Sequence, residues 1–134
     1  MKKEYSTPSP WQYDETINTA DYYGFVYLIT NKITGRMYVG RKYLTASAGK
    51  RKPRKESDWK KYWGSCKELL ADIKTLGEEH FERKILNFYK TRQEVNYGEL
   101  KEQVLRDVLF ARLPDGTRAF YNGNIALKYY APKT

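Results

Sequence analysis

The 134-residue chain has few of the residue types that build the commonest catalytic centres. It contains one cysteine, Cys66, and one histidine, His80. A single cysteine excludes a disulfide within the chain and any multi-cysteine zinc site, and it suits a reducing compartment. A single histidine excludes a multi-histidine metal centre. A nucleophilic pair of these two residues is disfavoured because they flank opposite ends of one expected helix, and no glycine-rich phosphate loop is present.

Long hydrophobic runs are also missing. No apolar stretch approaches the ~20 residues that are needed to cross a bilayer. The opening segment MKKEYSTPSPWQYDET contains no apolar core of the kind found in secretory signals. We therefore expect a protein that has no membrane partner and is cytoplasmic. The length predicts one domain that buries its own core.

Positive charge is present in excess and is concentrated in one segment. The chain carries 25 Lys and Arg against 16 Asp and Glu, which gives a net charge of +9. Residues 41–61 contain nine of the basic residues and two acidic ones. Such a segment attracts a polyanion, and the phosphates of nucleic acid are the leading candidate. The alternative is a solvated, lysine-rich loop that only maintains solubility.

The hydrophobic pattern predicts an α+β domain with a small antiparallel sheet in the order β-β-α-β-α-β. Residues 24–30 and 36–41 are rich in β-branched and aromatic side chains, and the segment NKITG between them supplies a turn. A third strand is expected over 81–89 and a short extended segment over 118–125. We expect residues 1–22 to form an irregular N-terminal arm before a domain at 23–134, with a long basic loop over 44–62.

Two helices are expected between and after these strands. Ser65 and Glu68 form a capping-box pattern for the first, Gly77 ends it, and the predicted core face is Leu69, Leu70, Ile73 and Leu76. The sequence TRQE at 91–94 opens the second, which is expected to reach about Phe110 with a core face of Tyr97, Leu100, Val104 and Val108.

Tyr27 and Tyr38 stand on the two strands of the predicted hairpin. With 13 tyrosines in the chain, an aromatic cross-strand pair that only stabilises the sheet is the default interpretation. The register of the strands decides whether both rings share a face.

The residues around this pair resemble a known family. FVY and YVG, with the two tyrosines eleven residues apart, are similar to the signature of the GIY-YIG nucleases, and the intervening TNKITGRM resembles the turn of that motif. The segment YWGSCKELLADIKTLGEEHFERKIL resembles the family's following Y-x-G-S, helix, glycine and strand, and FYN at 120–122 resembles its closing Tyr-Asn. The resemblance covers residues 24–122 in order.

This resemblance implies an endonuclease that hydrolyses phosphodiester bonds of double-stranded DNA with one divalent ion, Mg²⁺ or Mn²⁺. It implies that one of Tyr27 and Tyr38 activates or orients the attacking water. A phenol ionises near ~10, so a tyrosine base needs positive charge nearby, which Arg41 and Lys42 are placed to supply.

The resemblance also places a metal-binding glutamate in the last helix. We favour Glu99 there, with Glu102 as the alternative, because NYGE resembles the family position more closely. The default for either residue, without the resemblance, is a solvated helix glutamate. Asn122 matches the family's asparagine and is expected to order the site by hydrogen bonds.

One departure concerns the catalytic arginine, which many members carry on a helix soon after the second motif. Here the basic loop intervenes, so we favour Arg41 and keep Lys42, Arg51 and Arg54 as alternatives. The first motif also has Phe25 in place of glycine. The expected DNA-binding residues come from the motif, the loop and the closing segment: Gly40, Lys50, Arg51, Lys52, Arg54, Lys55, Lys60, Lys61, Tyr62 and Asn122.

The resemblance further implies a nuclease of a phage or mobile element, acting in a bacterial or phage-infected cell. Specificity would come from the basic loop, the arm or a homodimer, because phosphate contacts alone carry no sequence information. The rival hypothesis is a catalytically inactive nucleic-acid-binding protein on the same scaffold.

Overall fold

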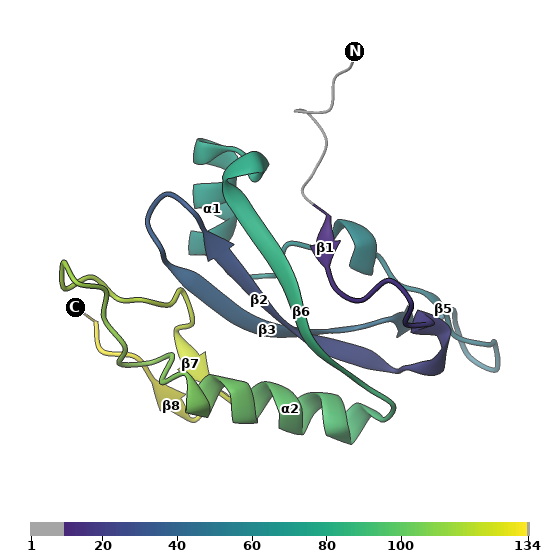
Figure 1. The fold of residues 1–134 in the computed structure, drawn as a ribbon. Coiled ribbons are helices and arrows are strands. Elements are labelled where there is room, and N and C mark those ends of the chain that lie inside the picture. Colours follow the sequence, from purple (N-terminus) through teal and green to yellow (C-terminus); the bar gives the residue numbers. More distant parts are fainter. Residues whose placement is uncertain (1–9, 134) are drawn as a thin grey trace, which may run out of the picture.

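The structure, a computed structural model that describes residues 10–133, confirms the α+β class (Figure 1). Its main sheet has four strands in spatial order β1-β6-β2-β3. Strand β2 pairs antiparallel with β6 and with β3, whereas β1 pairs parallel with β6. The strands are β1 (Trp11–Gln12), β2 (Gly24–Asn31), β3 (Met37–Tyr43) and β6 (Phe81–Tyr89).

The hairpin of β2 and β3 confirms the strongest sequence prediction. The side-chain oxygen of Asn31 accepts hydrogen bonds from the backbone N–H groups of Ile33 (2.9 Å) and Thr34 (3.2 Å), which holds the turn. The register pairs Tyr27 with Gly40. Because β3 is an edge strand, side chains from both of its faces are close to the space beyond the edge.

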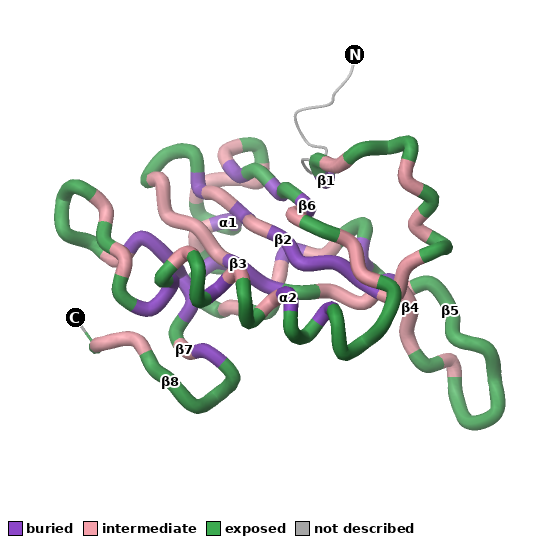
Figure 2. Tube along the Cα trace, turned by 60° about the horizontal axis from the view of Figure 1, so that its bottom comes forward, coloured by how far each residue is buried: buried purple, intermediate pink, exposed green. Residues whose placement is uncertain are grey.

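Strand β2 is buried along most of its length because it separates two apolar cores (Figure 2). Alternate side chains point to opposite faces of a strand. Phe25 and Tyr27 join a core that includes Leu69 of the first helix, whereas Val26 packs in a second core with Val108.

Helix α1 (Lys67–Leu76) ends at Gly77 as predicted, where φ is 102°. The prediction of a capping box formed by Ser65 and Glu68 was wrong. Cys66 is the N-cap residue and its side chain makes no capping bond, while the carboxylate of Glu68 lies 2.8 Å from Arg36 instead. Leu69 and Ile73 are buried as expected, but Leu70 is exposed.

Helix α2 (Arg92–Leu105) begins as predicted, because the Thr91 hydroxyl accepts from the backbone N–H of Glu94 at 3.1 Å. Three residues of its predicted core face were wrong, because Tyr97, Leu100 and Val104 are exposed, whereas Val108 is buried just beyond the end of the helix. The buried residues within the helix are Val95, Gly98 and Gln103. The helix also ends earlier than expected, since Asp107 takes a positive φ of 53°.

The basic loop has more structure than predicted. Strands β4 (Thr45–Ala46) and β5 (Lys55–Glu56) pair in a small hairpin, and a 3-10 turn, η3, covers Trp59–Lys61. Leu44 and Trp59 are buried in the first core, so the two ends of the loop are anchored by apolar side chains. The tip between the strands is exposed (Figure 2).

The N-terminal arm and the closing segment both pack on the sheet. The indole N–H of Trp11 donates to the carbonyl of Trp59 at 2.8 Å, which fastens the described part of the arm. Residue Phe120 bridges to Met37 beside β3, and β7 (Asn124–Ile125) pairs with β8 (Tyr129–Tyr130), so the expected last strand is a short hairpin. Two 3-10 turns, η2 (Thr19–Asp21) and η4 (Glu78–His80), complete the described elements. Within residues 10–133, no helix has the length and apolar character to cross a membrane.

Candidate active site

A cleft of about 660 Å³ opens beside the edge strand β3. Three segments meet there: β3, the inward face of α2, and the chain that follows Tyr121. Two residues before α1 also contribute. The lining residues are Tyr38, Arg41, Ser65, Cys66, Glu99, Gln103, Asn122, Gly123, Asn124, Ala126 and Leu127. Four of the predicted site residues, Tyr38, Arg41, Glu99 and Asn122, are therefore brought to one cavity.

Arg41 and Glu99 face each other across this cleft. The Arg41 Nε lies 3.7 Å from Glu99 Oε1, and it donates a hydrogen bond to Asn96 Oδ1 at 2.6 Å. Burial raises the pKa of Glu99, and the charge of Arg41 acts in the opposite direction. The alternative glutamate, Glu102, pairs instead with Arg106 (3.2 Å) and does not line the cleft.

Asn122 holds the middle of β3 in place. Its side-chain oxygen accepts from the backbone N–H of Val39 (3.0 Å), and its amide nitrogen donates to the Val39 carbonyl (2.8 Å). The Gln103 amide donates to the same carbonyl at 3.2 Å. Asn122 is buried, so its geometry supports an ordering role and leaves its amide committed to Val39 rather than to a phosphate.

The two motif tyrosines share one face of the hairpin. Their ring centroids are 6.2 Å apart, and the ring of Tyr62 also lies 6.2 Å from that of Tyr27. Tyr27 is 1% exposed and packs directly over Gly40, where a Cβ atom would come within 2.5 Å of the Tyr27 hydroxyl. Gly40 therefore makes room for the Tyr27 ring, and is itself buried. Tyr38 is the member of the pair that lines the cleft.

The expected lowering of the tyrosine pKa values by nearby cations was wrong. Burial raises the pKa of Tyr27 well above 10, with further increases from Tyr38 and Tyr62. Burial is also the main cause that raises the pKa of Tyr38, and the nearby Cys66 and Glu99 raise it further. The charge of Arg41 lowers it, but this is the smallest of the effects. Both phenols therefore keep their protons at neutral pH in this structure, and Tyr38 is placed to donate a hydrogen bond into the cleft.

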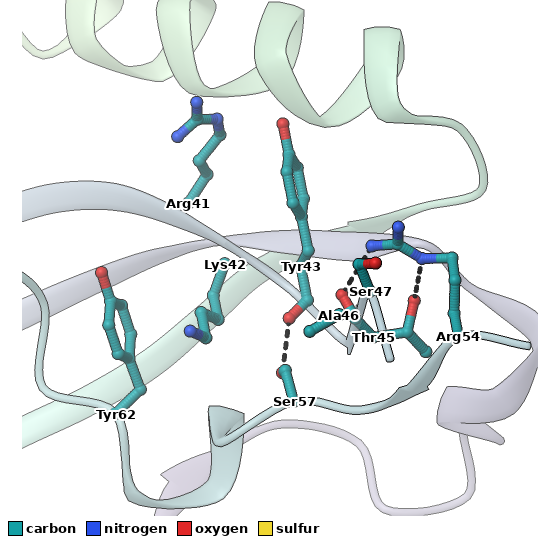
Figure 3. Close-up of a pocket in the computed structure, with 9 residues that line it drawn as sticks. All are labelled: Arg41, Lys42, Tyr43, Thr45, Ala46, Ser47, Arg54, Ser57 and Tyr62. Carbon is teal, nitrogen blue, oxygen red and sulfur yellow. Dashed lines mark hydrogen bonds between the residues drawn. The ribbon is translucent and has the colours of Figure 1, made fainter. Parts of the chain in front are cut away.

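Lys42 does not point into this cleft. Successive residues of β3 alternate, so Arg41 and Tyr43 extend toward α2 whereas Lys42 lies on the other side with Tyr62 (Figure 3). Its ammonium is 2.6 Å from Asp58 and 4.0 Å from the centre of the Tyr62 ring. Lys42 is therefore an anchored cation beside the site.

Lys42, Tyr43 and Tyr62 line an adjoining pocket of about 370 Å³ (Figure 3). Arg41 lines both cavities, and Arg54 is fixed in this one by hydrogen bonds to the Thr45 hydroxyl (2.9 Å) and carbonyl (2.8 Å). The remaining predicted loop cations are exposed outside both cavities: Lys50, Arg51, Lys52, Lys55, Lys60 and Lys61. The loop thus continues the positive surface away from Arg41.

The donor set of the cleft fits a hydrated Mg²⁺ or Mn²⁺ ion. Mg²⁺ prefers oxygen ligands and keeps several waters, so one or two carboxylates are sufficient. Glu99 is the carboxylate among the described lining residues, and the cleft has room for a hydrated ion. Within residues 10–133, the cleft included, no group of three or more His, Cys, Asp and Glu side chains is arranged to bind a metal, so Glu99 would have to share the ion with water and substrate oxygens.

The raised pKa of Glu99 predicts a pH-dependent stability effect in EDTA. Because the pKa is higher in the folded protein than in the unfolded chain, ionised Glu99 destabilises the fold above the raised pKa, and this penalty disappears as the pH falls below the ordinary glutamate value. Glu99→Gln should therefore raise Tm by a few degrees at about pH 7.5 and by little at about pH 4. Glu102→Gln is the control, and a Tm difference that does not change with pH would contradict the assignment.

Several residues that line the cleft, and Asn96, which bonds to Arg41 beside it, were missed by the sequence analysis. Asn96, Glu99 and Gln103 are spaced by three and four residues, which places polar side chains on one face of α2. That stripe was a usable signal for Asn96 and Gln103. Ser65 and Cys66 reach the cleft because the chain enters α1 there, and no pattern in the sequence indicates this.

Comparison with known proteins identifies one family model that matches most of the chain. The family model described as "Putative endonuclease segE, GIY-YIG domain" matches residues 8–125. The matched span includes the hairpin, both helices, the basic loop and Asn122. No curated protein and no solved structure matches the chain significantly.

Proposed function

The chain belongs to the GIY-YIG endonuclease family, and from this premise we propose that it is a DNA endonuclease that hydrolyses phosphodiester bonds with one divalent metal ion. The observation that carries the proposal is the cleft in which Glu99, Arg41 and Tyr38 meet. A carboxylate, a guanidinium and a phenol around one cavity match the requirements for phosphate hydrolysis.

Each of these side chains has a role that follows from its position. Glu99 would hold the Mg²⁺ or Mn²⁺ ion, whose charge would stabilise the phosphate and lower the pKa of a bound water. Arg41 lies 3.7 Å from that carboxylate and would bind the phosphate oxygens, where negative charge increases during the reaction. Tyr38 keeps its proton and would orient the attacking water or a phosphate oxygen by a hydrogen bond.

The other predicted residues act around this centre. Tyr27 and Gly40 shape the base of the hairpin, and Asn122 fixes the Val39 backbone between Tyr38 and Gly40. The adjoining pocket and the exposed loop would bind further phosphates of double-stranded DNA through Lys42, Arg54 and their neighbours. The phage or mobile-element role, a homodimer and a cytoplasmic location stay predictions from the sequence.

A plasmid-cleavage assay tests the proposal. The purified chain should convert supercoiled plasmid to nicked or linear forms with Mg²⁺ or Mn²⁺, and EDTA should stop the reaction. Binding without cleavage in either metal would favour the rival hypothesis of an inactive nucleic-acid-binding protein. Binding should be measured in EDTA, so that the two activities are separated.

A further inference from the structure

A second basic hollow lies outside the candidate active site. It has a volume of about 450 Å³ and is lined by Arg36, Glu68, Arg112, Gly116, Thr117, Arg118, Pro132 and Lys133. We call it the arginine hollow after its cationic members Arg36, Arg112, Arg118 and Lys133. Among the described lining residues, these four positive charges face one carboxylate, that of Glu68. The hollow is therefore strongly positive.

The fold holds two of these guanidinium groups in fixed positions. Arg36 pairs with Glu68 at 2.8 Å, stacks 4.1 Å from the centre of the Tyr121 ring, and donates to the Arg118 carbonyl at 3.1 Å. Arg118 in turn donates from Nη2 to the Asn122 carbonyl. Because both side chains are already ordered, an anion that binds there would lose little of its affinity to side-chain ordering.

The hollow contains an unsatisfied donor and more positive than negative charge. The Nε of Arg118 is buried and has no hydrogen-bond partner among the described residues, an arrangement that ordinarily destabilises a fold. Burial lowers the pKa of Arg118, the charges of Arg36 and Arg112 lower it further, and the carboxylate of Glu68 acts in the opposite direction. A bound anion would offset the excess of positive charge, and guanidinium groups match phosphate oxygens in geometry.

The position of the hollow relates it to the candidate active site. Arg118 bonds to Asn122, which lines the cleft, and Arg36 directly precedes β3. The seven residues of β3 span roughly 20 Å at about 3.3 Å per residue, with the basic loop following its far end. In Figure 1 the C-terminal segment and the hairpin of β4 and β5 lie at opposite sides of the molecule, with β2 and β3 between them.

We propose that the arginine hollow binds a backbone phosphate of the DNA several nucleotides from the bond that is cut, so that the duplex runs along β3 from the basic loop to the hollow. This inference rests on the proposed nuclease function and adds a second phosphate site on the other side of the cleft. The roughly 20 Å between the two basic regions corresponds to about six base pairs at 3.4 Å each.

The salt dependence of DNA binding tests the proposal. We would measure the affinity for a duplex of about 20 base pairs in EDTA, for the wild type and for Arg112→Gln/Lys133→Gln. The slope of log Kobs against log salt should become shallower by about 0.9 for each phosphate that the variant no longer neutralises, which is about 3.5-fold in affinity over a fourfold range of salt. Lys74→Gln/Lys101→Gln removes the same charge from exposed positions on α1 and α2, and should leave the slope unchanged.

A slope that is equal in the two double variants would overturn the proposal. Titration with inorganic phosphate separates the sources of the ligand: if phosphate binds the wild type but not the Arg112/Lys133 variant, while the DNA slopes agree, the hollow is a free-anion site and the proposal fails. Lys133→Glu alone leaves the bond of Arg112 to the Gly116 carbonyl in place, and should still flatten the slope. If the wild type and the variants bind DNA with the expected slopes, but the wild type does not cut DNA with Mg²⁺ or Mn²⁺, the nuclease function is refuted and the phosphate site is retained.

Discussion

Replacing Glu99 by Gln is expected to reduce metal-dependent DNA cleavage on the order of a thousandfold, equivalent to about 4 kcal/mol. Glu99 is the carboxylate that the described part of the chain brings to the cleft, so the amide would remove the charged ligand while nearly preserving the shape of the side chain. DNA affinity in EDTA should be maintained or increased, because a negative charge next to Arg41 is removed. Single-turnover cleavage and anisotropy binding measure the two effects.

Glu102→Gln is the matched control, one helical turn away on the same helix. Its carboxylate is engaged by Arg106 and lies outside the cleft, so cleavage should remain within about twofold of the wild type. Loss of cleavage in Glu102→Gln, with activity retained in Glu99→Gln, would exchange the roles of the two residues. Loss in both, with unchanged Tm values, would mean that both carboxylates reach the metal in the DNA complex.

The elements that were predicted well from the sequence depend on local or neighbouring residues. The hairpin around NKITG, the strand that starts at Phe81 and the start of α2 at Thr91 each have a turn or capping signal close in sequence. Because these elements were predicted correctly, their order along the chain and the α+β fold class were predicted correctly as well. Strand β1 was missed because two residues carry too little pattern to indicate a strand.

The inward face of α2 shows why the rest could not be predicted in the same way. Periodicity assumes that the apolar face of a helix is the buried one. Here Gly98 lets the helix approach Tyr89, and Gln103 bonds to β3, so the face that lines the cleft is polar. Local rules often fail at functional sites, and Glu99, which lines the cleft, lies on the face that those rules assign to solvent.

The pKa values of the motif tyrosines, Tyr27 and Tyr38, also could not be predicted from the sequence. Arg41 and Lys42 are adjacent in the chain, which suggested two cations next to the phenols. In the sheet they point to opposite sides of β3, and Lys42 is occupied by Asp58. Burial then dominates both tyrosine pKa values, and burial is a property of the assembled core.

Gly40→Ala is expected to destabilise the protein by about 1–3 kcal/mol and to abolish most of its cleavage activity. The new methyl group would lie 2.5 Å from the Tyr27 hydroxyl oxygen, 2.7 Å from its ring carbon Cζ and 2.9 Å from Cε2 of Tyr38. Tyr27 is fully packed and cannot move aside, so the strain would fall on the hairpin and displace Tyr38 from the cleft. Thermal unfolding and cleavage rates measure the loss.

Gly123→Ala provides the control, since it adds the same methyl group on the cleft wall. No atom of the described structure comes within 4 Å of that position, apart from the neighbours of Gly123 in the chain, so stability should stay within about 0.5 kcal/mol. If Gly40→Ala kept the Tm and the cleavage rate of Gly123→Ala, the close contact between Tyr27 and the second strand would be unnecessary for the site. Gly40→Ala could also lose cleavage while it keeps the wild-type Tm. The packing strain would then be small, and the lost cleavage would mean that the position of Tyr38 is required for the chemistry rather than for folding.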